Sequence, residues 1–367
     1  MKRFLVLVAL LLIGVLAVSA APKFKIGLVF DLAGRGDNSF NDSAYQGLVQ
    51  IAKSYKGYID GDPDNVNYGS DIQLKYMEPK AGGQDREILM RALAEDGYNL
   101  IYGIGFMFAD AIGKVAQDFP NTHFCIVDSF VAMPNVTGLT FKENEGSFLV
   151  GAVAGLLNKG KKIGFLGGMD IPLIHRFEAG FNAGAMYVNK DLRKEGMILG
   201  QYIGKDPTAF NDPTGGYNIA SNFYKQGASI VFHAAGGSGD GLFKAAEEAK
   251  QLSIGVDSDQ GLIYASAKEA ATKARAKYIL TSMLKRVDSA VFLAAKDFID
   301  AGGKLAAGER KFGLNENGVG FAENQFNKAL LAPVRDRIIQ LRTNVIVGNI
   351  VVPDENTDMA EWAKTLK

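Results

Sequence analysis

Carboxylates, aromatic rings and glycines stand at the points where apolar runs of this 367-residue chain end. The run FKIGLVF, for example, is followed by DLAGRGDNSFNDSAY at residues 31–45. The residues of interest after such runs are Asp31, Ser39, Phe40, Asp128, Phe210, Gly236 and Asp257. Carboxylates accept hydrogen bonds from hydroxyl and amine groups, and an aromatic face can stack on a planar ring for about 1–3 kcal/mol. These residue types predict a site for a small molecule that carries a flat ring and hydrogen-bond donors.

Phosphate, metal and catalytic chemistry are all disfavoured by the sequence. The stretch GGSGDG at 236–241 lacks the GxGxxG spacing, and no GxxxxGK[ST] motif occurs, so GGSGDG predicts a tight turn that lets the backbone approach a ligand. The three histidines and the single Cys125 are scattered, so neither a metal nor another cofactor is expected. His175, in PLIHRF, lacks the carboxylate and nucleophile of a catalytic set and is interpreted as a surface or loop residue.

Short apolar runs alternate with helical stretches along the whole chain, and this rhythm starts again after about residue 138. With 47% hydrophobic residues, the chain is long enough for two domains with sizeable cores. The alternation predicts α/β domains with parallel sheets and helices on both faces. Ligands of such sheets bind outside the carboxyl ends of the strands, where the residues above should meet. The stretch FMF at 106–108 is expected to pack at a helix start.

The N-terminal residues predict export from the cytoplasm. Lys2 and Arg3 precede the apolar run LVLVALLLIGVLAV, and VSA ends at Ala20 with small residues, so residues 1–20 resemble a cleavable signal peptide. An uncleaved membrane anchor is the alternative, although the apolar run is short for a membrane span. Cleavage would leave 38 basic and 40 acidic side chains, and this near-neutral balance argues against nucleic acid as a partner.

Several stretches of the chain share the order and character of a known set of motifs. They are DLAGRGDNSFNDSAYQGL, LIYGIGFMF, FCIVDS, FLGGMDIPLIHRFEAGF, VFHAAGGSGDG, IGVDSDQ and ILTSMLKRVDSAV. In this order they resemble the basic membrane protein family of ABC transporter substrate-binding proteins, whose best understood members look like purine nucleoside receptors. The resemblance extends from about Lys25 to Val352.

The resemblance implies a type I periplasmic binding protein, in which two doubly wound parallel-sheet lobes are joined by a three-segment hinge and close on a ligand. We expect the crossings near residues 130–138, 258–264 and 311–318, where strand-like runs give way to polar or glycine-containing stretches. The first lobe would then comprise residues 23–134 and 262–313. The second lobe would comprise residues 135–261 and 314–367.

The resemblance also implies a role for each candidate site residue. Asp31 resembles a polar contact near the base, Ser39 and Phe40 match an SFN element whose ring stacks on the base, and Asp128 matches the acidic residue that contacts base nitrogens. Phe210 resembles the opposing aromatic residue, Gly236 would allow close backbone approach, and Asp257 and Lys285 resemble the pair that holds ribose hydroxyls. Structural alternatives remain: Asp31 and Asp257 could cap helices, Lys285 could lie on a solvated helix face, and Phe210 could be a core residue.

Two departures from the family pattern stand out. Members commonly carry an acylated cysteine, and no cysteine follows the apolar run here, so the mature protein is expected to be soluble in the periplasm or cell envelope. Arg35 lies where a second acidic residue is common, which leaves the base preference open.

Three functions are compatible with the sequence. The first is a non-enzymatic binding protein, expected to be a monomer, that carries a nucleoside to an ABC transporter permease. The second is a sugar-binding or autoinducer-binding protein of the same fold. The third, an exported nucleoside hydrolase, is the least favoured because neither a calcium-binding aspartate cluster nor an acid–base set is evident.

Overall fold

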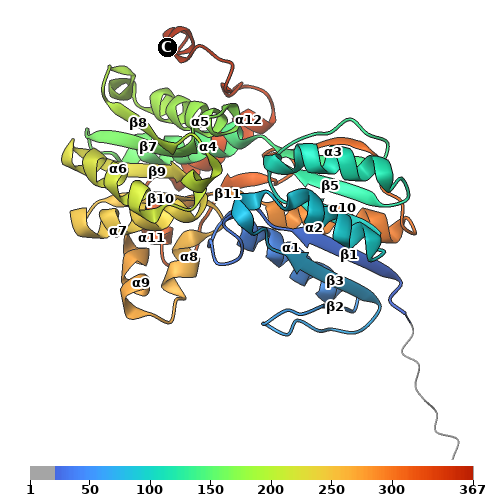
Figure 1. Ribbon diagram of the computed structural model, residues 1–367. Helices are drawn as coiled ribbons and strands as arrows, with labels where there is room; N and C mark the ends of the chain where they lie inside the picture. Colours follow the sequence, from blue (N-terminus) through green and yellow to red (C-terminus); the bar gives the residue numbers. More distant parts are fainter. Residues whose placement is uncertain (1–20, 367) are drawn as a thin grey trace, which may run out of the picture.

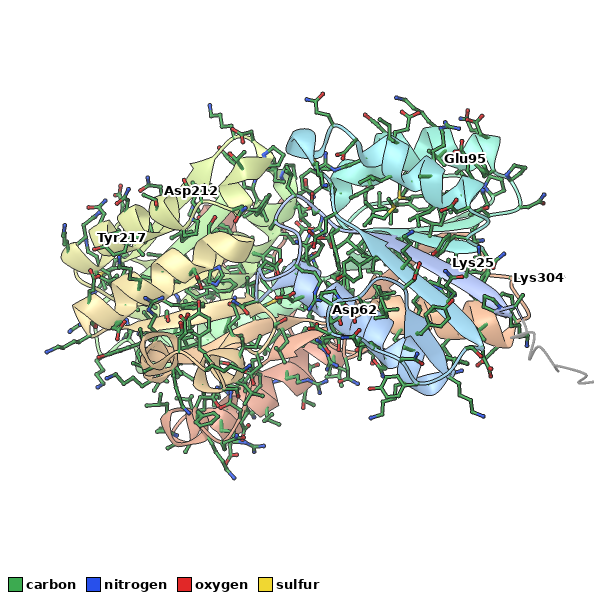
Figure 2. All side chains as sticks on the ribbon, turned by 60° about the horizontal axis from the view of Figure 1, so that its bottom comes forward. Lys25, Asp62, Glu95, Asp212, Tyr217 and Lys304 are labelled. Carbon is green, nitrogen blue, oxygen red and sulfur yellow. The ribbon has the colours of Figure 1, made fainter. Side chains whose placement is uncertain are left out.

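The computed structural model describes residues 21–366, which form two α/β lobes side by side (Figure 1). The predicted signal peptide, residues 1–20, lies outside the described residues. Within the described range, no helix has the length and apolar character needed to cross a membrane. In Figure 2, Lys25 and Lys304 mark the first lobe, and Asp212 and Tyr217 mark the second.

The first lobe is built on a seven-stranded sheet of order β12-β6-β5-β4-β1-β3-β2, in which every pairing is parallel. Its strands are β1 (Phe24–Val29), β2 (Gly57–Ile59), β3 (Ile72–Met77), β4 (Leu100–Gly103), β5 (His123–Val127), β6 (Val136–Phe141) and β12 (Gly308–Phe312). Helices α1 (Phe40–Ser54) and α10 (Val287–Asp300) cover one face, and α2 (Arg86–Glu95) and α3 (Ala109–Asp118) cover the other. Because both faces are covered, β4 and β6 are buried along their whole length.

The second lobe is built on a six-stranded sheet of order β13-β11-β10-β9-β7-β8, in which only β13 pairs antiparallel. Its strands are β7 (Lys162–Met169), β8 (Ile198–Gly204), β9 (Ala228–Ala234), β10 (Leu252–Asp257), β11 (Ile279–Lys285) and β13 (Val319–Phe321). Helices α4 (Glu143–Leu157) and α5 (Pro172–Val188) cover one face, and α6 (Pro213–Lys225) and α7 (Gly239–Ala249) cover the other. The remaining helices are α8 (Gln260–Ala265), α9 (Ala270–Arg275), α11 (Lys328–Leu331), α12 (Arg335–Ile346) and α13 (Met359–Lys364).

The chain crosses between the lobes three times, and two crossings differ from the predicted positions. The first lies between β6 and α4, after Phe141. The prediction of 130–138 ends too early, because β6 pairs with β5 and β12 inside the first sheet. The second lies between β11 and α10, after Lys285, and the prediction of 258–264 is wrong because β11 pairs with β10 in the second sheet. The third connects Phe312 with Val319 and overlaps the predicted stretch.

Backbone hydrogen bonds tie the three crossings to one another. Lys142 donates its backbone N–H to the carbonyl oxygen of Phe312 at 3.0 Å, and Arg286 donates to the carbonyl of Gly318 at 2.8 Å. The backbone N–H of Leu314 donates to the carboxylate of Glu145 at 2.8 Å. The crossings therefore run side by side as one connected hinge.

Candidate ligand-binding site

A cavity of about 670 Å³, including its opening to solvent, lies between the two lobes at the carboxyl ends of their strands. Of the predicted site residues, the cavity is lined by Asp31, Phe40, Asp128, Phe210, Gly236, Asp257 and Lys285. Ser39 is the exception, because it is fully buried behind the cavity wall.

Asp31 lies just after β1, and part of its carboxylate is already engaged by the protein. Its Oδ1 accepts hydrogen bonds from the backbone N–H of Leu32 at 2.8 Å and from Nη2 of Arg86 at 3.0 Å. Burial raises the pKa of this carboxyl, while the Leu32 and Arg86 contacts act in the opposite direction. Gly105 makes room for the other oxygen, since a Cβ there would lie 2.5 Å from Oδ2 of Asp31. Among residues 21–366, no hydrogen bond to Oδ2 is found, so Asp31 can offer this oxygen to a ligand in the cavity.

Asp37 is a buried carboxylate in the cavity wall that the sequence interpretation missed. It accepts hydrogen bonds from the backbone N–H groups of Ser39 at 2.9 Å, Asn41 at 2.8 Å and Asp42 at 3.1 Å, and so caps α1 where Phe40 begins the helix. Burial raises its pKa to about 6. An Asp shortly before a helical stretch is a capping signal that could have revealed it.

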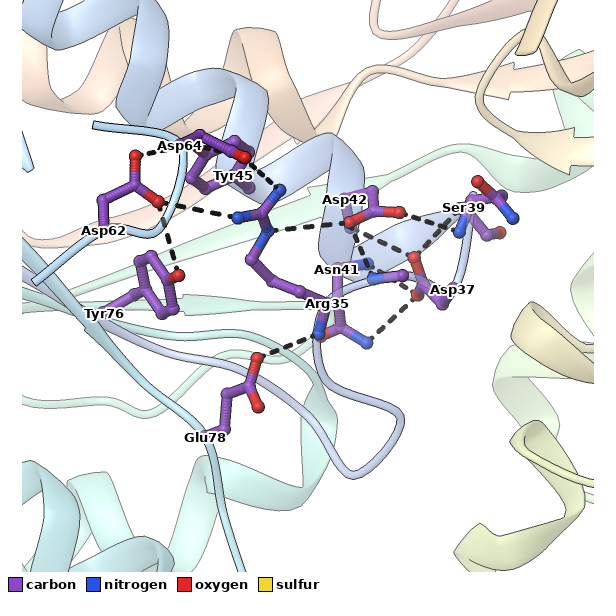
Figure 3. Close-up of polar contacts among 12 residues, drawn as sticks. Arg35, Asp37, Ser39, Asn41, Asp42, Tyr45, Asp62, Asp64, Tyr76 and Glu78 are labelled. Carbon is purple, nitrogen blue, oxygen red and sulfur yellow. Dashed lines mark hydrogen bonds and ion pairs between the residues drawn. The ribbon is translucent and has the colours of Figure 1, made fainter. Parts of the chain in front are cut away.

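Arg35 points away from the cavity, so the departure from the family pattern lies outside the site (Figure 3). Its guanidinium carbon lies 3.6 Å from the centroid of the Tyr45 ring and its Nη2 lies 3.0 Å from Asp64. Its backbone N–H donates to Glu78 at 3.2 Å. Arg35 therefore anchors the outer side of the loop that carries Asp37 and Phe40.

Lys285 ends β11 and lies in the cavity wall with only 2% of its side chain exposed. The alternative of a solvated helix face is therefore wrong. Its Nζ is 2.7 Å from the Asp128 carboxylate and 3.1 Å from Glu143, and these two carboxylates are its ion-pair partners among the described residues. Burial alone would lower the pKa of Lys285, but Asp128, Glu143 and Asp257 together raise it, and the ammonium stays charged.

Three aromatic rings surround the Lys285 ammonium. The ring centroids of Phe40, Phe141 and Phe177 lie 5.2, 5.1 and 5.5 Å from Nζ. Such distances permit cation–π attraction. Phe177, on α5, also lines the cavity and was missed because a phenylalanine inside an apolar helix carries no sequence signal of a site.

Asp257 ends β10 and connects the second lobe to the first. Its Oδ2 accepts a hydrogen bond from the Ser39 hydroxyl at 2.5 Å, and the neighbouring Ser258 hydroxyl donates to the Ser39 carbonyl at 3.0 Å. Burial raises the pKa of Asp257 to about 7 and that of Asp128 to about 6. Both residues have left-handed backbones, with φ of 62° and 66° respectively, a strained conformation that is common at functional sites.

Phe210 forms the second-lobe wall at the end of a short helical turn, Pro207–Phe210, that Asp206 caps. Its ring covers Gly168, where a Cβ would lie 2.5 Å from the ring. Gly236 has a φ of 53°, and a Cβ there would lie 3.2 Å from the Phe210 carbonyl oxygen. Phe210 is partly exposed to the cavity, so it is not simply a core residue.

The other residues considered in the sequence analysis are the FMF stretch and His175. Phe108 is fully buried, as expected of the FMF stretch, whereas Phe106 lines the cavity. His175 lies outside the residues that line the cavity and contacts Asp170 at 2.6 Å. Among residues 21–366, no group of three or more His, Cys, Asp or Glu side chains is placed to hold a metal ion.

Comparison with known proteins identifies relatives across almost the whole chain. Residues 24–356 match the family described as ABC transporter substrate-binding protein PnrA-like. The CD4+ T-cell-stimulating antigen of Listeria monocytogenes is 35% identical, over 92% of this chain and 90% of the relative. The ABC transporter nucleoside-binding protein BmpA of Lactococcus lactis is 32% identical, over 90% of this chain and 89% of the relative.

The fold also matches solved structures. An ABC transporter solute-binding protein from Aeropyrum pernix superimposes with a TM-score of 0.74 at 25% identity, over 94% of this chain and 97% of that one. This chain therefore shares the two-lobed α/β fold of a solved solute-binding protein.

Proposed function

Because the chain belongs to the PnrA-like family of ABC transporter substrate-binding proteins, we propose that it binds a purine nucleoside and delivers it to the membrane permease of an ABC transporter. The observation that carries the proposal is the composition of the cleft. Phe40 from the first lobe and Phe177 and Phe210 from the second line the same cavity as four carboxylates, those of Asp31, Asp37, Asp128 and Asp257. A relative of 32% identity is named as a nucleoside-binding protein.

The chemistry of the cleft suits the two ends of a nucleoside. The rings of Phe40 and Phe210 provide apolar faces for a base, and the carboxylates of Asp31 and Asp128 can accept hydrogen bonds from its N–H groups. Asp257 can accept from ribose hydroxyls, and Lys285 can donate to their oxygens. Because these groups come from both lobes, closure of the lobes completes the site.

Thermal unfolding with a panel of ligands tests this function. We expect inosine, guanosine or adenosine to raise the unfolding temperature, and hypoxanthine or ribose alone to raise it much less. A ligand present at 100 times its Kd should add about 2.7 kcal/mol to the free energy of unfolding. Equal shifts with ribose or allose alone would contradict the proposal and favour a sugar-binding protein.

We propose further that the protein is a non-enzymatic monomer that acts outside the cytoplasm. The family of transport proteins and the export-like N-terminal sequence support this proposal. Incubation with inosine should release no free base on chromatography, whereas released hypoxanthine would indicate a hydrolase.

Two other measurements test the state and location of the protein. Light scattering of the purified protein tests whether it is a monomer, and fractionation of the source cells tests whether it lies outside the cytoplasm.

A further inference from the structure

A chain of charged side chains runs from the cleft, past the hinge, to the C-terminal segment. It consists of Asp128, Lys285, Glu143, Arg176 and Glu355, and we call it the charged chain. Its successive contacts are 2.7 Å from Asp128 to Lys285, 3.1 Å from Lys285 to Glu143, 3.1 Å from Glu143 to Arg176 and 2.6 Å from Arg176 to Glu355. Only Asp128 and Lys285 line the cavity, so the other three members have no role in the site described above.

Glu143 occupies the middle of the charged chain and is completely buried. It begins α4, directly after the first crossing, whereas Lys285 ends β11, directly before the second crossing. One carboxylate oxygen of Glu143 faces the Lys285 ammonium and the other accepts a hydrogen bond from Nη1 of Arg176. A buried carboxylate needs such partners because an unpaired charge in the interior is strongly destabilising. Glu143 is therefore held between two cations, one of which faces the cleft.

We propose that Glu143 is a positioning residue for ligand binding, which holds the Lys285 ammonium at the cleft wall by attracting it from the hinge side. This inference rests on the proposed function. The ammonium has three N–H donors. Asp128 accepts a hydrogen bond from the ammonium on the first-lobe side, and a carboxylate oxygen of Glu143 faces it at 3.1 Å from the hinge side as an ion pair. Without Glu143, the ammonium would lose its contact on the hinge side, and its position at the cleft wall would be less firmly fixed.

Arg176 and Glu355 support Glu143 from the other side. Arg176 donates through Nε and Nη2 to both oxygens of Glu355, at 2.9 and 2.6 Å, a two-pronged contact that fixes the plane of the guanidinium. The C-terminal segment that carries Glu355 is itself held, because Asn144 donates to the carbonyl oxygens of Val352 and Pro353 at 3.1 Å. The C-terminal segment thus fixes the position of Arg176 through Glu355. Arg176 in turn donates a hydrogen bond to Glu143, and Glu143 faces the Lys285 ammonium.

A double-mutant cycle tests whether Glu143 acts through Lys285. Inosine affinity is measured by calorimetry for the wild type, Glu143→Gln, Lys285→Met and the double variant. We expect Glu143→Gln to weaken binding about tenfold, which corresponds to about 1.4 kcal/mol. In the Lys285→Met background, Glu143→Gln should cause no further loss. A full tenfold loss in that background, or no loss in the single variant, would overturn the proposal.

Two further variants show whether a loss of affinity is specific to the charged chain or follows from the loss of any ion pair. Glu355→Gln removes a partly exposed member of the charged chain and should weaken inosine binding by about two- to fivefold, since it leaves Glu143 and Lys285 in place. Glu323→Gln is the matched control, because Glu323 also pairs with an arginine, Arg335, but lies outside the charged chain. We expect the control to bind as the wild type does. An equal loss in both variants would show a general effect of losing an ion pair and would overturn the proposal.

A ligand-free measurement separates this proposal from the proposed function. Amine-reactive labelling with mass spectrometry should modify Lys285 far more slowly than Lys114, whose side chain is 66% exposed. In Glu143→Gln, or in Glu355→Gln if the first variant does not fold, Lys285 should be labelled faster while Lys114 is unchanged. Unaltered protection of Lys285 would overturn the positioning role. A wild-type protein that binds no nucleoside but shows this selective labelling would instead contradict the proposed function alone.

Discussion

Removal of the aromatic faces of the cleft should weaken nucleoside binding and leave the protein folded. Phe40 and Phe210 line the cavity from opposite lobes, and both are only partly buried where they pack against the core. Base stacking on such a ring contributes about 1–3 kcal/mol, so each alanine variant should raise the Kd of inosine by about 5- to 150-fold.

The cost to folding should be measurable, because both rings make packing contacts. Full burial of a phenylalanine contributes about 1.5–3 kcal/mol, and a partly exposed ring should therefore lose about 1 kcal/mol of unfolding free energy when truncated. Phe40→Ala also loses the cation–π contact of its ring with Lys285, 5.2 Å away, which adds about 0.5–1 kcal/mol. Stacking between two walls requires closure, so the double variant should lose less affinity than the sum of the single losses.

Calorimetry, denaturant unfolding and small-angle scattering with and without inosine would measure these effects on the wild type, both single variants and the double variant. Phe326→Ala is a suitable control, because Phe326 is a 51% exposed ring that does not line the cavity. If Phe40→Ala unfolds the unliganded protein while the folded fraction binds normally, Phe40 is a packing residue and the stacking argument is refuted.

Three other substitutions test individual polar groups. Asp128→Ala should weaken inosine binding by about 1.5–3 kcal/mol, because it removes a charged acceptor; an unchanged Kd in calorimetry on the folded variant would assign Asp128 a structural role. Since the folded-state pKa of Asp257 is raised to about 7, its contribution to stability is present below the usual value of 3.8 and is lost as the pH rises through about 7. Unliganded stability in denaturant should therefore fall between about pH 4 and pH 7, and Asp257→Asn should flatten this dependence; an equally steep profile in the variant would contradict it. Ser39→Ala removes the hydrogen bond to Asp257 across the lobes, worth about 0.5–1.5 kcal/mol, so scattering of the unliganded variant should show a larger radius of gyration, and an unchanged radius would count against a closing role.

Local patterns in the sequence were sufficient for the α/β architecture and for most of the cavity wall. The alternation of apolar runs with helical stretches predicted parallel sheets with helices on both faces, and the structure confirms them. Asp31, Asp128, Gly236 and Asp257 all follow apolar runs in the sequence, and all line the cavity. This was possible because a parallel sheet brings the carboxyl ends of its strands to one edge, whatever the connections between them. Whether these residues bind a ligand stays a prediction.

Tertiary structure alone decided which strand joins which lobe and which charges meet. The sequence interpretation assigns residues 262–313 to the first lobe, but the pairing of β11 with β10 places Ile279–Lys285 in the second sheet and moves the second crossing to Lys285. Lys285 and Asp128 are separated by 157 positions, and Ser39 and Asp257 by 218, yet each pair is in direct contact. Glu143 and Arg176 are not predicted from the sequence for the same reason. The residues next to a charged side chain in a helix do not show whether the fold will bury that side chain. Strand order and long-range ion pairing depend on how whole elements pack, and residue spacing does not record that packing.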